Sequence, residues 1–207
     1  LKKVLIKPIL KKEIYEIKKN SKNFEKRIKK ILIIGGSQGA AFFDNTITDL
    51  IIKISKSHEL EIIQQISNKN NILLNREKYS TAKINFEFFN FTNESDKIYE
   101  DIDLAVTRGG ASTLSELSHL NIPFIAIPLP SARDNHQFYN SNYFYQKNCC
   151  WIFDQNKFDK ESFINLVLEI LKNNEDYIKK INQLEKLTNK NTWNAINKHI
   201  IEIINEN

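Results

Sequence analysis

Two glycine-rich turns combine residue types that bind phosphorylated ligands. The first, GGSQGA at residues 35–40, follows the apolar run ILII; its glycines let backbone N–H groups approach a ligand, and Ser37 adds a hydroxyl donor. The second, RGGASTLSE at residues 108–116, sets the guanidinium group of Arg108 and two glycines before an apolar-periodic stretch. Each turn is predicted to open a helix, whose N-terminus favours an anion such as a phosphate.

Glu116 has two interpretations that the residues leave open. Thr113 and Glu116 have the spacing of a capping box, in which the glutamate bonds back to the backbone at the start of a helix. Alternatively, a carboxylate one turn inside the helix accepts hydrogen bonds from two hydroxyls of a sugar. A cap does not require Arg108, Gly109 or Gly110, and these neighbours favour a nucleotide-sugar site with a pyrophosphate on the helix N-terminus.

A third turn, PLPSARDNHQ at residues 128–137, is dense in polar side chains. Its prolines stiffen the exit from a strand. The predicted helix then begins with four polar residues, more than one cap needs: Asp134, Asn135, His136 and Gln137. Neutral amide and imidazole groups suit the hydroxyls of a sugar better than they suit a metal.

The fourth turn, NFTNESDKIYED at residues 90–101, carries an aromatic residue that could meet a base. Phe91 could stack on the base or wall it, while the backbone near Thr92 reads its edge. Without the other three turns, a loop with one buried aromatic side chain is the simpler interpretation.

Several other kinds of site do not fit the sequence. A dinucleotide site requires a GxGxxG turn and an acidic residue at the end of the second strand, where this chain has Gln64 and Gln65. No GK[ST] follows the first turn, and no cluster of His, Cys and Asp has metal-ligand spacing, so we expect neither a cofactor nor a metal. The only cysteines, Cys149 and Cys150, are adjacent and are predicted to be free thiols.

Six short apolar runs alternate with longer helical patterns. The alternation predicts an α/β fold with a parallel sheet covered on both faces, in which ligands bind at the strand-to-helix turns. We assign residues 1–27 to an interdomain segment, 28–157 to a Rossmann-like core and 158–207 to C-terminal helices of the same domain. The predicted strands are residues 31–34, 60–66, 84–89, 103–106, 123–128 and 150–153.

Composition indicates a globular protein without a membrane span. The chain has 207 residues, 41% of them hydrophobic, and neither an apolar run of spanning length nor the apolar region of a secretory signal. Its net charge of +5 is concentrated in a lysine-rich beginning, which is either a solvated helix face or a surface for anionic membranes; no nucleic acid partner is expected. A first residue Leu1 and the absence of methionine lead us to expect a fragment that lacks its beginning.

In this order, the four turns resemble those of the MurG family of bacterial UDP-N-acetylglucosamine (UDP-GlcNAc) transferases. The resemblance is carried by GGSQGA at 35–40, R-x-G-A-x-T-x-x-E at 108–116 and PLPxAxDNHQxxN at 128–140. It covers nearly the whole chain but only the second, donor-binding half of that two-domain enzyme. The implied fold is therefore the C-terminal half of a GT-B glycosyltransferase, a Rossmann-like parallel sheet flanked by helices.

The resemblance implies a role for each turn. It places Ser37 at the donor phosphates, Glu116 at the ribose hydroxyls, Thr92 at the uracil and Gln137 at the GlcNAc hydroxyls. The implied substrate-binding residues are Ser37, Thr92, Ala111, Ser112, Thr113, Leu114, Ser115, Glu116 and Gln137, and the secondary candidates are Gly36, Gln38, Phe91, Arg108, Gly110, Asn135 and His136.

One segment departs from the family pattern. The family joins its halves through a segment usually containing GNPxR, and this chain has Leu10 where that arginine would fall. The linker or uracil contact would then depend on Lys7 or Lys11.

The implied activity is transfer of GlcNAc from UDP-GlcNAc to the undecaprenyl-linked muramoylpentapeptide of peptidoglycan synthesis. The family acts without a cofactor, at the cytoplasmic face of the inner membrane, and serves cell shape and division. Its catalytic residues are expected in an acceptor-binding N-terminal domain with a GGTGGH loop, which these residues lack.

Two alternatives remain beside this reading. The chain could be the catalytic subunit of a split transferase, comparable to the two-part eukaryotic GlcNAc transferase of N-glycan synthesis, and would then need a partner subunit. It could also be a non-catalytic module that binds UDP-sugars.

Overall fold

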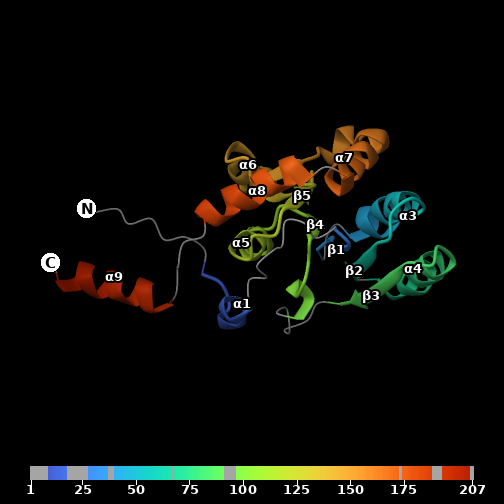
Figure 1. Ribbon diagram of the computed structural model, residues 1–207. Coiled ribbons are helices and arrows are strands. Elements are labelled where there is room, and N and C mark those ends of the chain that lie inside the picture. Colours follow the sequence, from blue (N-terminus) through green and yellow to red (C-terminus); the bar gives the residue numbers. More distant parts are fainter. Residues whose placement is uncertain are drawn as a thin grey trace.

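The computed structural model describes residues 9–17, 28–36, 40–66, 68–90, 97–172, 174–187 and 193–205. Its centre is a six-stranded parallel sheet with the strand order β3-β2-β1-β4-β5-β6 (Figure 1). The sheet confirms the predicted fold class, and each strand overlaps one of the predicted runs. The strands are β1 (Lys30–Ile34), β2 (Glu61–Gln65), β3 (Asn85–Phe89), β4 (Leu104–Thr107), β5 (Phe124–Ala126) and β6 (Cys150–Ile152).

Helices connect the strands and cover the sheet. From residue 160 onward the described residues are all helical, as the amphipathic pattern predicts, whereas most of residues 1–27 lies outside the described ranges. In chain order the helical elements are α1 (Lys12–Glu16), α2 (Ala40–Phe42), the π-helix η1 (Phe43–Ile47), α3 (Thr48–Ser55), α4 (Lys69–Thr81), the 3-10 helix η2 (Lys97–Tyr99), α5 (Ala111–His119), η3 (Arg133–Asn135), α6 (His136–Gln146), η4 (Gln155–Lys157), α7 (Lys160–Lys172), α8 (Asn174–Leu187) and α9 (Trp193–Asn205).

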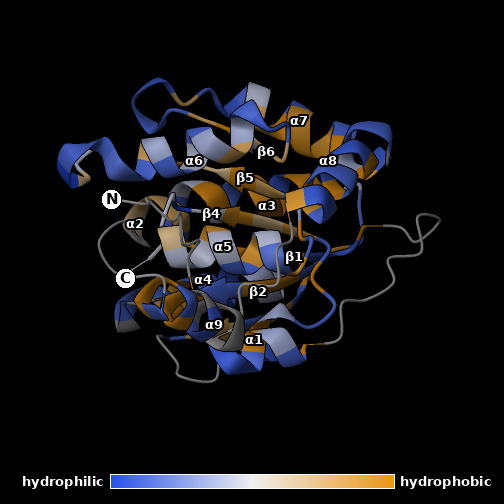
Figure 2. Ribbon diagram, turned by 90° about the vertical axis from the view of Figure 1, so that its left-hand side faces the viewer, coloured by the Kyte–Doolittle hydropathy of each residue, from blue (hydrophilic) through white to orange (hydrophobic). Residues whose placement is uncertain are grey.

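The two faces of the sheet bury separate apolar cores. Side chains of β1 alternate between them, with Ile31 and Ile33 in one core and Leu32 in the other. The first core is completed by α3, α4 and α7, the second by α1, α5 and residues packed from α6, and α8 contributes to both. Figure 2 shows apolar strands such as β4 and β5 enclosed by helices with hydrophilic outer residues. Burial on both faces explains why the strands are nearly continuous apolar runs.

The strand order reverses direction between β1 and β4, the two strands at the centre of the sheet. At such a reversal the loops leaving the carboxyl ends of the two strands run to opposite faces and leave a crevice that binds ligands. Gly35 and Gly36 follow β1 at this point, and Arg108 to Gly110 follow β4. The topology thus brings together the two glycine turns singled out in the sequence.

The two cysteines are free thiols, as the sequence predicts. Cys149 and Cys150 are both free and buried at the start of β6, and burial raises their pKa values to about 11 and about 12. The thiols are therefore protonated at neutral pH.

Among the helices of the described residues, none is long and apolar enough to cross a membrane.

Candidate functional site

The N-terminus of α5 carries no side-chain cap. Gly110 is the N-cap residue, and the first backbone bond of the helix runs from the N–H of Leu114 to the carbonyl of Gly110, at 3.0 Å. Thr113 is thus a residue of the first helical turn, and the capping box that its spacing with Glu116 allowed does not form. The amide groups of Ala111, Ser112 and Thr113 precede the first N–H that a helix can satisfy internally.

These first residues are accessible, so the end of the helix can receive an anion. Ala111 and Ser112 are exposed, and Thr113 and Ser115 are half-buried. The positive end of the helix dipole and its unsatisfied N–H groups both favour negative charge there. Leu114, by contrast, is fully buried in the core, where it anchors the helix.

Gly109 is clamped between β4 and α6. Its N–H donates to Oε1 of Gln137 at 3.2 Å, and its carbonyl accepts from Nδ2 of Asn140 at 3.0 Å. A Cβ atom at this position would overlap the Gln137 carbonyl oxygen and the Ser141 hydroxyl. The close approach of α6 therefore requires glycine at this position. Through its two hydrogen bonds, Gly109 joins the second sequence motif to the third.

Gly110 is not explained in this way. Its φ of −69° is open to any residue, and a Cβ atom there would meet no atom within 4 Å. Neither conformation nor packing therefore requires glycine at the N-cap of α5. A ligand that approaches the backbone closely would supply the missing reason.

The guanidinium group of Arg108 lies inside the protein. It is 5% exposed, donates from Nη1 to the carbonyl of Ile127 at 3.0 Å and to Oε1 of Gln155 at 2.5 Å, and lies 4.7 Å from the ring centroid of Phe43. Burial lowers the pKa of Arg108 to about 10, so the group remains charged at neutral pH. These contacts tie the end of β4 to β5 and η4, and the predicted phosphate contact would have to be made in addition to them.

Glu116 is held by a tyrosine that the sequence motifs do not single out. The hydroxyl of Tyr99, on η2, donates to Oε2 of Glu116 at 2.6 Å. Burial raises the pKa of Glu116, while the hydrogen bond from Tyr99 and the positive charge of Lys11 oppose that rise. The carboxylate is half-buried and oriented, which suits a polar ligand more than a solvated helix face.

The positive charge of Lys11 acts on this carboxylate from the segment where the family pattern is broken. It is exposed and immediately precedes α1, while Leu10, the residue at the family's arginine position, is buried in the core. Lys11, the residue after Leu10, thus brings a positive charge near Glu116. Lys7 lies outside the described residues.

Gln137 lies between the segments that follow β4 and β5. Besides the bond from Gly109, its Oε1 accepts from the N–H of Leu129 at 3.0 Å, so the amide oxygen is engaged twice. This assignment leaves the Nε2 group of Gln137 as the donor for a ligand, and no partner for it is found among the described residues.

The residues before Gln137 form a strained turn. Asp134 and Asn135 have φ values of 52° and 50°, in the left-handed region, and α6 begins at the next residue. His136 is exposed and contacts the carbonyl of Arg133 through Nδ1 at 2.7 Å. Left-handed non-glycine residues gather at functional sites, and Asn and Asp tolerate this region best.

The loop after β1 is fixed by the neighbouring strand. Gly36 has a φ of +67°, a conformation that favours glycine, and its N–H donates to Oε1 of Gln65 at 3.0 Å. Gln65 at the end of β2 thus serves the turn itself. Ser37 and Gln38, and on the other loop Phe91 and Thr92, lie outside the described residues, so their contacts remain predictions.

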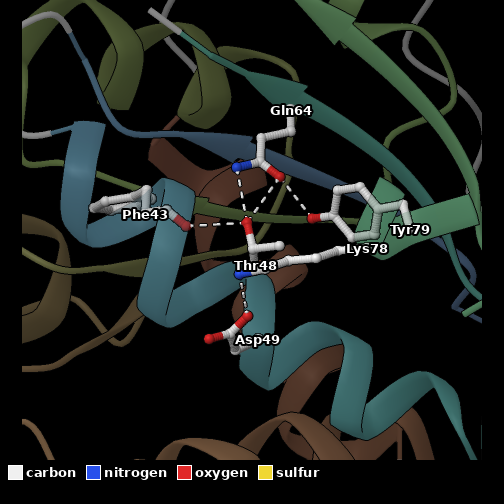
Figure 3. Close-up of polar contacts among 6 residues, drawn as sticks. All are labelled: Phe43, Thr48, Asp49, Gln64, Lys78 and Tyr79. Atoms are coloured by element: carbon white, nitrogen blue, oxygen red, sulfur yellow. Dashed lines mark hydrogen bonds and ion pairs between the residues drawn. The ribbon is translucent and has the colours of Figure 1, made fainter. Parts of the chain in front are cut away.

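A buried polar network supports the helix that follows this loop (Figure 3). Gln64 accepts the hydroxyl of Tyr79 at 2.6 Å through Oε1 and donates from Nε2 to Thr48 at 3.1 Å, and Thr48 in turn donates to the carbonyl of Phe43 at 3.2 Å. The bond from Thr48 to Phe43 spans five residues, which is the hydrogen-bond spacing of the π-helix η1 in the same segment. Such a local widening of a helix is often found near functional sites. The buried carboxylate of Asp44 accepts from Asn71 at 2.9 Å.

Sequence reasoning overlooked the residues that hold the ligand candidates. Asn140 and Tyr99 do fall inside motifs, at the end of PLPxAxDNHQxxN and within residues 90–101, but nothing in their spacing reveals their partners. Gln155 comes from another part of the chain, whereas Lys11 was already named as a possible substitute for the family arginine. Among the described residues no group of His, Cys, Asp or Glu could hold a metal ion. What the site offers is amide donors for an anion and an oriented carboxylate for hydroxyls.

Comparisons with known proteins agree with this arrangement. The model of the glycosyltransferase family 28 C-terminal domain matches residues 30–196. The chain is 38% identical over 205 residues to the UDP-N-acetylglucosamine–N-acetylmuramyl-(pentapeptide) pyrophosphoryl-undecaprenol N-acetylglucosamine transferase of Pelagibacter ubique, covering 98% of this chain and 56% of that protein. The transferase of the same name from Rickettsia massiliae is 38% identical over 146 residues, or 69% of this chain and 39% of the relative. The chain thus spans about half the length of these relatives.

Solved structures share the fold. The crystal structure of Acinetobacter baumannii MurG superposes with a TM-score of 0.71 at 22% identity, over 88% of this chain and 51% of that one. WaaG, a glycosyltransferase of lipopolysaccharide biosynthesis, superposes with a TM-score of 0.61 at 15% identity, over 89% and 51% of the two chains. The arrangement of strands and helices is therefore that of one half of a GT-B glycosyltransferase. From the match to the family model and the identity to the curated transferases, we conclude that the chain belongs to glycosyltransferase family 28, as its C-terminal, MurG-type domain.

Proposed function

We propose that this chain binds UDP-GlcNAc as the donor of a GlcNAc transfer that makes the lipid-linked disaccharide of peptidoglycan. The diphosphate lies on the N-terminus of α5, the ribose hydroxyls bind Glu116, and Nε2 of Gln137 donates to the sugar. The single observation that carries this proposal is the uncapped N-terminus of α5, with open space beside Gly110 and an oriented carboxylate one turn further in.

The contribution to catalysis follows from the same arrangement. As the bond between GlcNAc and the diphosphate breaks, negative charge develops on the leaving UDP. Backbone N–H groups at Ala111, Ser112 and Thr113 are already aimed by the helix and need no reorganisation to stabilise this charge. The buried Arg108 ties the strand ends together behind them. The domain therefore lowers the barrier by stabilising the departing group.

Activation of the acceptor hydroxyl requires residues outside this site. In this assignment Glu116 binds the ribose hydroxyls, so it is not the base for an incoming sugar. We assign that role to an acceptor-binding half, in the same polypeptide or in a partner subunit, because the relatives are about twice as long. The acceptor would be the undecaprenyl-linked muramoylpentapeptide at the cytoplasmic face of the inner membrane.

The proposal is tested by calorimetric titration of the purified chain with UDP-GlcNAc, UDP-glucose and NAD. We expect UDP-GlcNAc to bind more tightly than UDP-glucose, because the relatives' names specify transfer of N-acetylglucosamine, and NAD to give no heat. Failure of UDP-GlcNAc to bind a chain with a cooperative thermal transition would contradict the proposal.

A second assay separates a transferase half from a non-catalytic binding module. The chain is mixed with an acceptor-binding half of the family and with a lipid-linked muramoylpentapeptide analogue, and release of UDP is measured. Acceptor-dependent release supports the transferase, and tight binding without release under these conditions supports the module.

A further inference from the structure

Tyr99 is a buried side chain with its polar end at the candidate site. Only 4% of its surface is exposed, and it packs in the core that also holds Leu114. Its hydroxyl meets the carboxylate of Glu116 at 2.6 Å, the short distance of a charge-assisted bond. Because the ring is fixed by packing, the position of the hydroxyl is fixed as well. Glu116 is thereby held by a rigid donor from another element.

The geometry of a carboxylate gives this bond a consequence for ligands. Each oxygen can accept two hydrogen bonds, and a vicinal diol uses two acceptor sites of one carboxylate at once. Tyr99 takes one site on Oε2 and so restrains the rotation of the carboxylate, while Oε1 and the rest of Oε2 are left for other donors. A carboxylate without this restraint would lose rotational freedom when it binds the diol, which lowers affinity.

We propose that Tyr99 is a positioning residue that orients Glu116 for the vicinal diol of a ribose and so favours ribonucleotides over deoxyribonucleotides. The inference rests on the proposed donor function and adds to it a residue that determines specificity. Tyr99 belongs to η2 and lies within the turn of residues 90–101 that the sequence singles out.

The charges around Glu116 support this role. Burial raises its pKa, and the hydroxyl of Tyr99 together with the charge of Lys11, from the residue before α1, keeps the carboxylate form favoured. Burial and the neighbouring carboxylate raise the pKa of Tyr99 well above its usual value, so its hydroxyl stays a donor over the working pH range. Loss of that hydroxyl would raise the pKa of Glu116 further.

The test measures the affinities of UDP and 2′-deoxy-UDP for four proteins: the wild-type chain, Tyr99→Phe, Glu116→Gln and a control, Tyr177→Phe. Tyr177 is also a buried tyrosine, 6% exposed, and its hydroxyl donates to the carbonyl of Asp103 at 2.7 Å, outside the candidate site. Phenylalanine fills the same volume in both cases, and thermal melting checks that each variant is folded.

We expect Tyr99→Phe to weaken UDP binding roughly fivefold to tenfold, the effect of losing one charge-assisted hydrogen bond, and to bring the UDP to 2′-deoxy-UDP ratio near that of Glu116→Gln. Tyr177→Phe should keep the wild-type affinity and ratio. When the pH is lowered, Tyr99→Phe should lose UDP affinity at a higher pH than the wild type.

The outcomes separate this inference from the proposed function. If the wild type binds UDP and Glu116→Gln weakens it, while Tyr99→Phe keeps the wild-type affinity and ratio, the positioning role is wrong and the donor function stands. If Tyr99→Phe only lowers the melting temperature, as Tyr177→Phe does, the bond is structural and the inference is also overturned. A folded wild type that binds no UDP contradicts the donor function and the inference with it.

Discussion

The side-chain oxygen of Gln137 accepts the N–H of Gly109 at 3.2 Å, and so joins the turn after β4 to the first turn of α6. Both residues belong to motifs that the sequence presents as separate stretches. In the structure they form one support, which Asn140 completes from the other side of the Gly109 peptide. The position of the α5 N-terminus therefore depends on α6 as much as on β4.

The two glycines of this turn should respond differently to alanine. Gly109→Ala should lower the free energy of unfolding by about 1–3 kcal/mol, since its Cβ would overlap the backbone of α6. Gly110→Ala should leave stability unchanged and weaken UDP binding roughly tenfold, because its methyl group enters the space assigned to the diphosphate. Urea denaturation and calorimetry on the two variants check this pair. Unchanged UDP affinity in Gly110→Ala would argue against the assigned place of the diphosphate.

Gln137 has a supporting oxygen and a nitrogen assigned to the ligand, and two substitutions separate them. Gln137→Glu keeps an acceptor for the N–H groups of Gly109 and Leu129, so the variant should remain stable and bind UDP, but lose the preference for UDP-GlcNAc over UDP. Gln137→Ala removes the acceptor as well and should lower the free energy of unfolding by about 1–3 kcal/mol. Equal preference for UDP-GlcNAc in the wild type and Gln137→Glu would refute a sugar contact through Nε2.

Arg108 tests whether a buried guanidinium serves the fold or the phosphate. Arg108→Lys cannot reproduce the bonds to Ile127 and Gln155 or the packing on Phe43, so we expect a loss of about 1–3 kcal/mol in unfolding free energy with UDP affinity largely kept. Arg133→Lys, on an exposed side chain of η3, is the control and should change neither quantity. A large loss of affinity in a fully stable Arg108→Lys would instead assign the arginine to the phosphates.

Asp44 should make stability depend on pH. It is fully buried; burial raises its pKa, and hydrogen bonds from Asn71 and Gln64 only partly oppose the rise. A carboxyl whose pKa is higher in the folded state stabilises the fold below its unfolded pKa and loses that contribution as the pH rises through its folded pKa. Asp44→Asn should therefore stabilise the protein at pH 7, by about 1.4 kcal/mol for each unit by which the two pKa values differ.

The control for this variant is Asp49→Asn, a change at an exposed carboxylate of α3 that is paired with Lys78. Urea denaturation at pH 7 and near pH 3 measures both proteins. The gain from Asp44→Asn should disappear at the lower pH, and Asp49→Asn should show no such gain. A stabilisation by Asp44→Asn that is equal at the two pH values would mean that ionisation is not its cause.

The sequence could predict the fold because its patterns are local. Apolar runs such as 31–34 and 150–153 are long enough to mark strands, and the amphipathic period of residues 160–205 marks helices. The glycine turns also mark the carboxyl ends of two strands. Because the strands are parallel, the sheet brings both turns to the same edge. Family resemblance adds the order of the turns.

Side-chain partners could not be predicted, because they depend on distances in space. Arg108 stands at the head of a phosphate-like motif, yet its guanidinium group fills a buried position between Phe43 and Gln155. The spacing of Thr113 and Glu116 fits a cap, but the helix begins earlier, at Ala111, and the glutamate meets Tyr99 instead. Partners from distant segments leave no periodic signal in the sequence.

The central claim is that the diphosphate of the donor binds at the N-terminus of α5. Its most direct test is a titration of the isotope-labelled chain with UDP, followed by amide resonances. We predict the largest shifts at the N–H groups of Gly110, Ala111, Ser112 and Thr113, with smaller shifts on the outer face of α7. If UDP binds and these four resonances stay unchanged while those of another element move, the account of this site is contradicted.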